Sequence, residues 1–199
     1  PTPLDLAAPD SAQLLRSRLS SDGMRVVTYG MDSTFEDMLN CVYAARNYVV
    51  SPAGLKSAQH LKEKYGTPYE LADSVRFDTP GSNARSGRML VMHQQFLADT
   101  VRKELHRDNP SAEIDTATFF RFVPEYAHKG DVKLSEEDDF ISLVKERRYD
   151  VIIADPLFRR ALPDFTGTFI PLPHFAVSGQ LNAVKSMQEF IRPLISSDI

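Results

Sequence analysis

The sequence has little of what marks several large classes of protein. It contains one cysteine, Cys41, among 199 residues, which excludes an internal disulfide and a cysteine-rich metal site within this chain. No apolar stretch approaches the roughly 20 residues that a membrane-spanning helix needs. The formal net charge is -4 and no dense run of Lys and Arg occurs, which disfavours binding to a nucleic-acid backbone. We therefore expect a cytoplasmic protein whose partners include neither nucleic acid nor membrane.

Common catalytic motifs are also missing. The sequence has no Ser-His-Asp arrangement and no phosphate-loop lysine. The stretch GMDS at 30–33 follows an expected strand but lacks the three spaced glycines of a dinucleotide site. Tightly bound nicotinamide is therefore disfavoured.

What the sequence does contain is an alternation of strand and helix patterns. The run NYVV at 47–50 breaks at Ser51-Pro52, continues as a helix-period segment at 53–65, and stops at Gly66. Further strands are expected at 24–29, 88–92, 116–123, 150–154 and 168–172, and further helices at 11–19, 33–43, 95–106, 136–147, 157–162 and 180–195. The alternation predicts an α/β fold with two doubly wound, parallel-sheet, Rossmann-like lobes.

Residues 78–87 are rich in turn formers and have no apolar period, which is typical of a boundary between lobes. We expect a first lobe at 1–80 and a second lobe at 81–199 that ends in a helix. The opening residues PTPLD at 1–5 are typical of the tail of a strand, so the first lobe is expected to lack its first strand and the chain to be a piece of a longer protein.

Four polar residues come directly after predicted strands, where doubly wound sheets open their ligand crevice. They are Ser51, His93, Asp155 and His174, and we take them as candidate cofactor-binding residues. His174 is also the candidate catalytic residue, because an imidazole between a strand and a helix start can donate a proton or coordinate a metal.

Each candidate has a structural alternative that the sequence leaves open. Ser51 and Asp155 each precede a proline and can cap the helix that follows. His93 can stand at a helix start facing solvent, and His174 can be hydrogen-bonded to a loop carbonyl.

Several motifs, taken in order, resemble a known family. They are the run NYVVSPAGLKSAQHLKEKYGTPY at 47–69, YDVIIADP at 149–156, FIPLPH at 169–174 and TPLD at 2–5. Together they resemble the nitrogenase component 1 family of oxidoreductases, and they match the middle and C-terminal Rossmann-like domains of one subunit.

The resemblance implies a reductase subunit that pairs with a homologous subunit and accepts electrons from an ATP-dependent iron–sulfur reductase. It implies a small-molecule or tetrapyrrole-type substrate. The family's iron–sulfur ligands are cysteines of an N-terminal domain that this chain lacks, so we expect no cofactor or metal ligand set within the chain and little activity from it alone. The turn at Val50-Ser51-Pro52 has no cysteine, which departs from the catalytic nitrogenase subunit, whereas the resemblance implies that His174 corresponds to its metal-binding histidine.

Two other functions remain open. A non-catalytic cofactor or tetrapyrrole carrier, or an assembly scaffold, would use Ser51 and His174 as ligand contacts without redox chemistry. A nucleotide-sugar or small-molecule enzyme on the same fold would require a phosphate-binding loop, for which residues 81–87 are the candidate.

Overall fold

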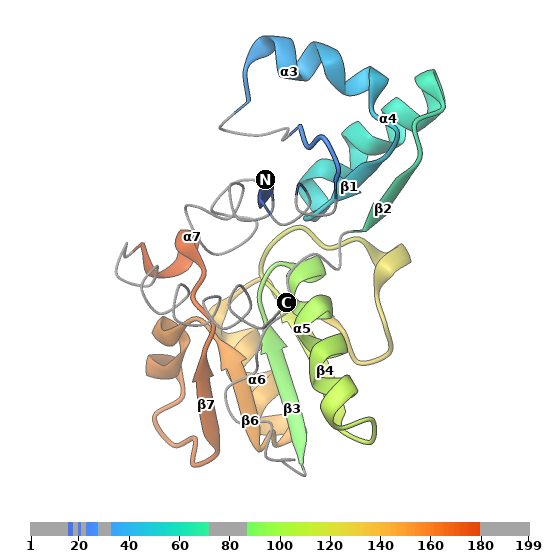
Figure 1. Cartoon of the computed structure of the whole chain (residues 1–199). Coiled ribbons are helices and arrows are strands. Elements are labelled where there is room, and N and C mark those ends of the chain that lie inside the picture. The colour runs from blue at the N-terminus through green and yellow to red at the C-terminus, as the bar shows by residue number, and fades with distance from the viewer. Residues whose placement is uncertain (1–15, 18–19, 21–22, 28–32, 72–86, 180–199) are drawn as a thin grey trace.

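The computed structural model describes residues 16–17, 20, 23–27, 33–71 and 87–179. The described part is an α/β structure with two parallel sheets (Figure 1). The smaller sheet pairs β1 (Asn47–Val49) with β2 (Tyr69–Leu71). The larger one contains β3 (Arg88–Met92), β4 (Glu113–Thr118), β5 (Val132–Lys133), β6 (Val151–Ala154) and β7 (Thr168–Pro171). The predicted α/β class with parallel sheets is confirmed.

The larger sheet has the strand order β5-β4-β3-β6-β7, and every pair in it is parallel. From β3 the chain winds outward to β4 and β5, then crosses to the other side of β3 for β6 and β7. The order therefore reverses between β3 and β6. In open α/β sheets, ligands bind at the carboxyl ends of the strands beside such a reversal.

Helices connect and cover the strands. The α-helices are α3 (Phe35–Asn40), α4 (Leu55–Tyr65), α5 (Gln95–Asp108), α6 (Glu137–Arg147) and α7 (Phe175–Ser178), and the 3₁₀ helices are η1 (Cys41–Tyr43), η2 (Pro52–Gly54), η3 (Pro124–Tyr126) and η4 (Pro156–Ala161). None of the helices in the described part has both the length and the apolar character needed to cross a membrane.

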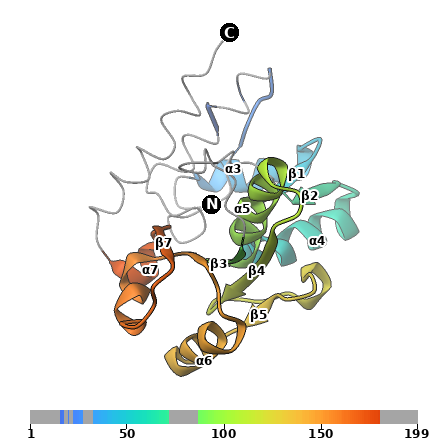
Figure 2. The same cartoon turned by 90° about the horizontal axis from the view of Figure 1, so that it is seen from below.

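The strand β3 is buried on both faces because α5 and α6 lie on opposite sides of the sheet (Figure 2). Successive strand side chains point to opposite faces. Met89 and Val91 join the cluster under α5, whereas Leu90 and Met92 join the cluster that includes Phe140 of α6. This arrangement explains why the strand sequence is an uninterrupted apolar run.

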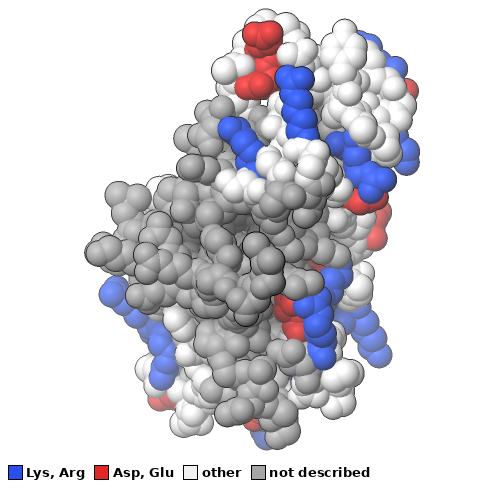
Figure 3. Space-filling view, viewed as in Figure 1, with Lys and Arg blue, Asp and Glu red and all other residues white. Residues whose placement is uncertain are grey.

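The smaller sheet lies toward the end of the larger sheet to which the arrowheads of β3, β6 and β7 point (Figure 1). Val49 of β1 and Leu55 and Ala58 at the start of α4 form a cluster with Phe96 of α5. The first turn of α5 is therefore shared by both parts. Among the described residues on the face drawn in Figure 3, acidic and basic side chains are interspersed.

The expected strands at 88–92, 150–154 and 168–172 are confirmed to within one residue. The bounds of the strand expected at 116–123 are wrong, because β4 begins at Glu113 and ends at Thr118. Parallel pairing of Glu113 through Ala117 with all of β3 sets these bounds. Buried polar side chains conceal the strand in the sequence, and the aromatic residues that follow it belong to a loop.

Other expectations need correction. The helices expected from residues 33 and 136 begin at Phe35 and Glu137, and capping boxes precede them at Thr34 with Asp37 and at Glu136 with Asp139. Met24–Val27 are not in a strand, and the helix expected at 157–162 is the 3₁₀ helix η4. The boundary segment expected at 78–87, except for Gly87, and the final helix expected at 180–195 lie outside the described residues, so the division at 80 stays a prediction.

Candidate functional site

Three of the four candidate residues meet at the carboxyl edge of the larger sheet. His93 follows β3, Asp155 follows β6, and His174 comes soon after β7. Their exposed fractions are only 1%, 1% and 2%, respectively. The alternative in which His93 faces solvent is therefore wrong. The strands bring these side chains together beside the reversal of strand order.

His93 is held in one orientation by the loop after β7. Its Nε2 lies 3.3 Å from the carbonyl oxygen of Pro173, and because a carbonyl only accepts, Nε2 carries the hydrogen. Nδ1 is buried and has no hydrogen-bond partner among the described residues. Burial, together with the neighbouring His174, lowers the pKa of His93 well below its usual value. His93 is therefore a neutral imidazole.

His174 lies between two other rings. Its centroid is 4.5 Å from that of His93 at an interplanar angle of 46°, and 3.9 Å from that of Phe120 at 11°. The backbone N–H of Ala176 donates to His174 Nδ1 at 3.2 Å, so a neutral His174 carries its proton on Nε2. The ring plane and the tautomer are thus both fixed by contacts within the fold.

Asp155 has the capping role that the sequence left open as an alternative. Its Oδ1 accepts the backbone N–H of Leu157 at 2.9 Å at the start of η4. Its Oδ2 accepts the backbone N–H of His174 at 2.7 Å. Asp155 therefore ties the loop after β6 to the backbone of His174. Its assignment as a cofactor-binding residue stays a prediction.

Ser51 lies at the same edge but in the smaller part. It is buried and begins η2, yet its hydroxyl makes no capping hydrogen bond. The predicted helix start is right, and the predicted side-chain cap is wrong. The Gln94 side chain donates from Nε2 to the carbonyl of Val50 at 3.1 Å, which joins the loop containing Ser51 to the residue after His93.

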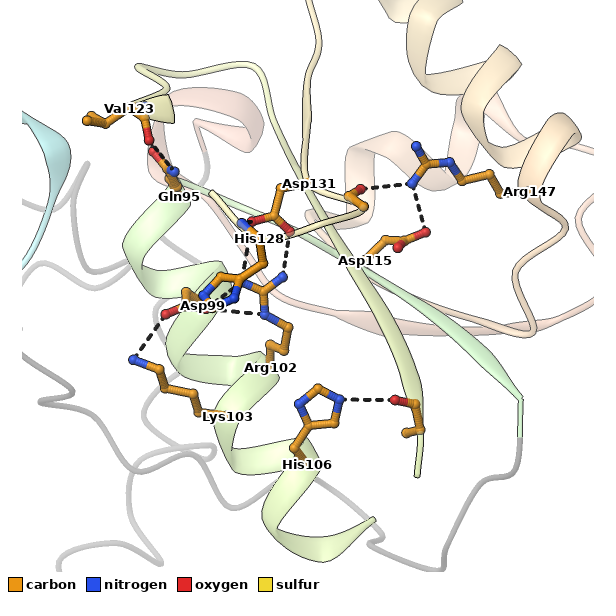
Figure 4. Close-up of polar contacts among 12 residues, drawn as sticks. Gln95, Asp99, Arg102, Lys103, His106, Asp115, Val123, His128, Asp131 and Arg147 are labelled. Carbon is orange, nitrogen blue, oxygen red and sulfur yellow. Dashed lines mark hydrogen bonds and ion pairs between the residues drawn. The ribbon is translucent and has the colours of Figure 1, made fainter. Parts of the chain in front are cut away.

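Two glutamines follow His93 and were not among the residues expected at the site. Gln95 is buried and pairs with the backbone of Val123, donating to its carbonyl at 3.0 Å and accepting from its N–H at 2.7 Å (Figure 4). His93, Gln94 and Gln95 thus contact three different loops, those after β7, β1 and β4. Three consecutive polar residues after an apolar strand could have identified these glutamines as site residues. No pattern in the sequence identifies Phe120 as a contact of His174.

Buried ion pairs hold the supporting framework. Arg102 of α5 contacts Asp131 at 2.5 Å and Asp99 at 2.5 Å (Figure 4). The side chains of Arg102 and Asp131 are 6% and 1% exposed, so this contact fixes the segment before β5 against α5. Next to this contact, Arg147 donates to the carbonyl of Gly130, the residue before Asp131, and to Asp115 of β4, which also accepts from the hydroxyl of Tyr149.

Metal binding requires several converging ligands. Within the described ranges, no group of three or more His, Cys, Asp and Glu side chains is placed to hold a metal ion. The residues described at this edge therefore do not fit an iron–sulfur cluster.

Comparison with known proteins yields a likeness in structure alone. No known family profile matches the chain, and no curated protein matches it. A solved structure titled "Nitrogenase Cp1 at pH 6.5" is similar, with a TM-score of 0.53 and 12% sequence identity over 100% of this chain. The chain spans 59% of the length of that structure. At this identity the likeness shows the fold.

Proposed function

We propose that this chain is the ligand-contacting part of a nitrogenase component 1-like oxidoreductase subunit. The observation that carries the proposal is the buried contact between His93 and His174 at the carboxyl edge of the sheet. The substrate is a small molecule or a tetrapyrrole-type compound. Its electrons come from an ATP-dependent iron–sulfur partner protein in the cytoplasm, and a homologous subunit completes the assembly. The fold likeness to nitrogenase Cp1 supports this proposal.

The proposed roles follow from the hydrogen bonds of each residue. Reduction of a double bond consumes protons as well as electrons, and the Nε2–H of His174 can donate a hydrogen bond to the charge that develops on the substrate and relay a proton to it from water. The donated proton is regained from water, and the electrons leave the reduced partner protein, which is oxidised. His93 and Ser51 contact the substrate, and Asp155 positions His174 through its backbone N–H.

The full assembly tests this proposal. The parent subunit, its homologous partner and an ATP-dependent iron–sulfur reductase are combined, and ATP-dependent substrate reduction is measured for wild type and His174→Gln. Loss of a proton donor lowers the turnover number by about 10²–10⁴-fold. His60→Gln, on the exposed face of α4, is the matched control and leaves turnover unchanged. Sustained turnover by the isolated chain, without partner or reductase, would show that the proposal is wrong.

A second candidate is a non-catalytic carrier or scaffold for a tetrapyrrole or another flat cofactor. The rings at this edge favour it: Phe120 stacks on His174 and the tilted His93 ring lies beside His174, and flat π-systems bind well against such side chains. Absorbance titration of the chain with protochlorophyllide distinguishes the two functions. In a carrier, His174→Ala weakens binding. In a reductase, His174→Gln leaves binding within a few-fold of wild type and removes turnover.

A further inference from the structure

We propose that the ligand of this site presents an uncharged N–H or O–H group to Nδ1 of His93, so that the site selects hydrogen-bond donors over anions. The inference rests on the proposed function only in taking the carboxyl edge of the larger sheet as the ligand site. It adds the chemical class of the group that is recognised there.

The direction of the His93 hydrogen bond fixes what Nδ1 offers. A neutral imidazole has one ring hydrogen, and the contact of 3.3 Å with the carbonyl oxygen of Pro173 places it on Nε2. The other tautomer would bring two acceptors together. Nδ1 is therefore a lone-pair acceptor.

The surroundings of Nδ1 favour a ligand at this atom. His93 is 1% exposed, and Nδ1 has no hydrogen-bond partner among the described residues. Buried polar atoms in folded proteins are nearly always paired. Protonation of Nδ1 is opposed by burial and by the adjacent His174, which together lower the pKa of His93. A donor on the ligand satisfies the atom without a charge on the ring.

The same lone pair disfavours other ligand classes. Carboxylate and phosphate oxygens are acceptors, so they would repel Nδ1 rather than bind it. A metal ion would need more ligands than the described part of the chain brings together. The parallel stack of Phe120 on His174 provides a flat aromatic neighbour, which suits a planar donor such as a phenol or a pyrrole.

Nitrogen NMR of the histidine-labelled chain tests the inference with three matched probes: phenol, its methyl ether anisole, and benzoate. Without a ligand, His93 Nδ1 is expected to give the signal of an unprotonated ring nitrogen at neutral pH. Phenol should shift this signal and bind about tenfold more tightly than anisole, as expected for one added hydrogen bond. Benzoate should bind no better than anisole.

Three results would each overturn the inference: a protonated Nδ1 in the unliganded chain, no shift with phenol, or tighter binding of benzoate than of phenol at His93. His93→Gln retains a donor for Pro173 and an acceptor, so it should keep the preference for phenol over anisole. His93→Leu should lose it. The wild-type spectra decide the matter if a variant fails to fold.

The two proposals fail in different ways. If benzoate is preferred but His174→Gln still removes ATP-dependent reduction, the ligand class is wrong and the proposed function stands. If phenol is preferred but His174→Gln leaves turnover unchanged, the ligand class stands and the catalytic role of His174 is wrong.

Discussion

The rings of His93 and His174 lie with centroids 4.5 Å apart at the carboxyl edge of the larger sheet, although the two residues follow different strands. Strands β3 and β7 are separated in the sheet by β6, so the loops must lean toward one another to make this contact. The bond from His93 to Pro173 and the bond from the His174 backbone to Asp155 hold them there. This relationship joins the fold to the proposed chemistry.

The low pKa of His93 makes stability depend on pH. Burial, with a further contribution from His174, keeps the folded-state pKa well below the usual 6.5. Below pH 6.5 the unfolded chain binds a proton that the folded chain does not, so stability falls as pH falls toward the folded pKa. His93→Gln should remove this dependence, whose slope is at most about 1.4 kcal/mol per pH unit.

Urea denaturation between about pH 5 and pH 7 measures this slope. His60→Gln is the control, because His60 lies on the exposed face of α4. A wild-type slope that is unchanged in His93→Gln would contradict a neutral, buried His93.

Removal of Arg102 should destabilise the fold strongly. Its partner Asp131 is 1% exposed, so Arg102→Met leaves a buried carboxylate without its cation. Such losses cost about 3–5 kcal/mol in the free energy of unfolding. Chemical denaturation measures the change.

The same helix offers a matched control. Arg107 pairs with Glu104 at 2.5 Å in an i,i+3 arrangement like that of Arg102 with Asp99, but its side chain is 60% exposed. Arg107→Met should therefore cost about 0.5 kcal/mol or less. Equal effects of the two substitutions would mean that burial does not set the strength of the Arg102 contacts.

Asp115 should contribute stability that is lost in acid. Burial raises the pKa of Asp115, but hydrogen bonds from the hydroxyl of Tyr149 and the guanidinium of Arg147 lower it by more. The pKa of Asp115 therefore lies below its usual value of 3.8. A depressed folded-state pKa stabilises the fold above the unfolded value, and the stabilisation disappears as pH falls through the folded value. Asp115→Asn should cost about 2 kcal/mol at neutral pH, and the difference from wild type should shrink below about pH 4.

Denaturation midpoints measured from pH 7 down to about pH 2 give this difference. Asp164→Asn, in an exposed turn, is the control and should follow wild type throughout. A constant difference across the whole range would show that Asp115 acts without its charge.

Phe120 should position His174. The two rings are nearly parallel, with centroids 3.9 Å apart. Phe120→Leu keeps an apolar side chain but removes the stack, which is worth about 0.5–1.5 kcal/mol. The His174 ring signals should broaden or shift in NMR spectra, and affinity for phenol should fall by about 2–10-fold. Unchanged His174 signals would mean that other contacts fix the ring.

Much of the fold was predictable, because uninterrupted runs of apolar residues, as in β3 and β6, indicate buried strands. The predicted bounds of β4 were wrong because Asp115 and Thr116 are polar and yet buried. The partner of Asp115, the hydroxyl of Tyr149, is distant in the sequence and meets it only in the folded sheet. The short strands β2 and β5 carry too few residues for a periodic signal.

The positions of His93, Asp155 and His174 were predictable, because parallel strands end at one edge. Their partners were not. Phe120 reaches His174 from the loop after β4, and Gln94 reaches Val50 in the smaller part. Such contacts depend on the strand order and on the loop paths, neither of which is encoded in local sequence patterns.

A crystal structure of the chain with bound phenol tests the central claim most directly. The account predicts that the phenol oxygen lies about 2.7–3.2 Å from Nδ1 of His93, with the phenol ring beside His174 and Phe120. An ordered phenol bound only elsewhere, for example at the cluster of Asp115 and Arg147, would contradict a ligand site at the carboxyl edge of the sheet.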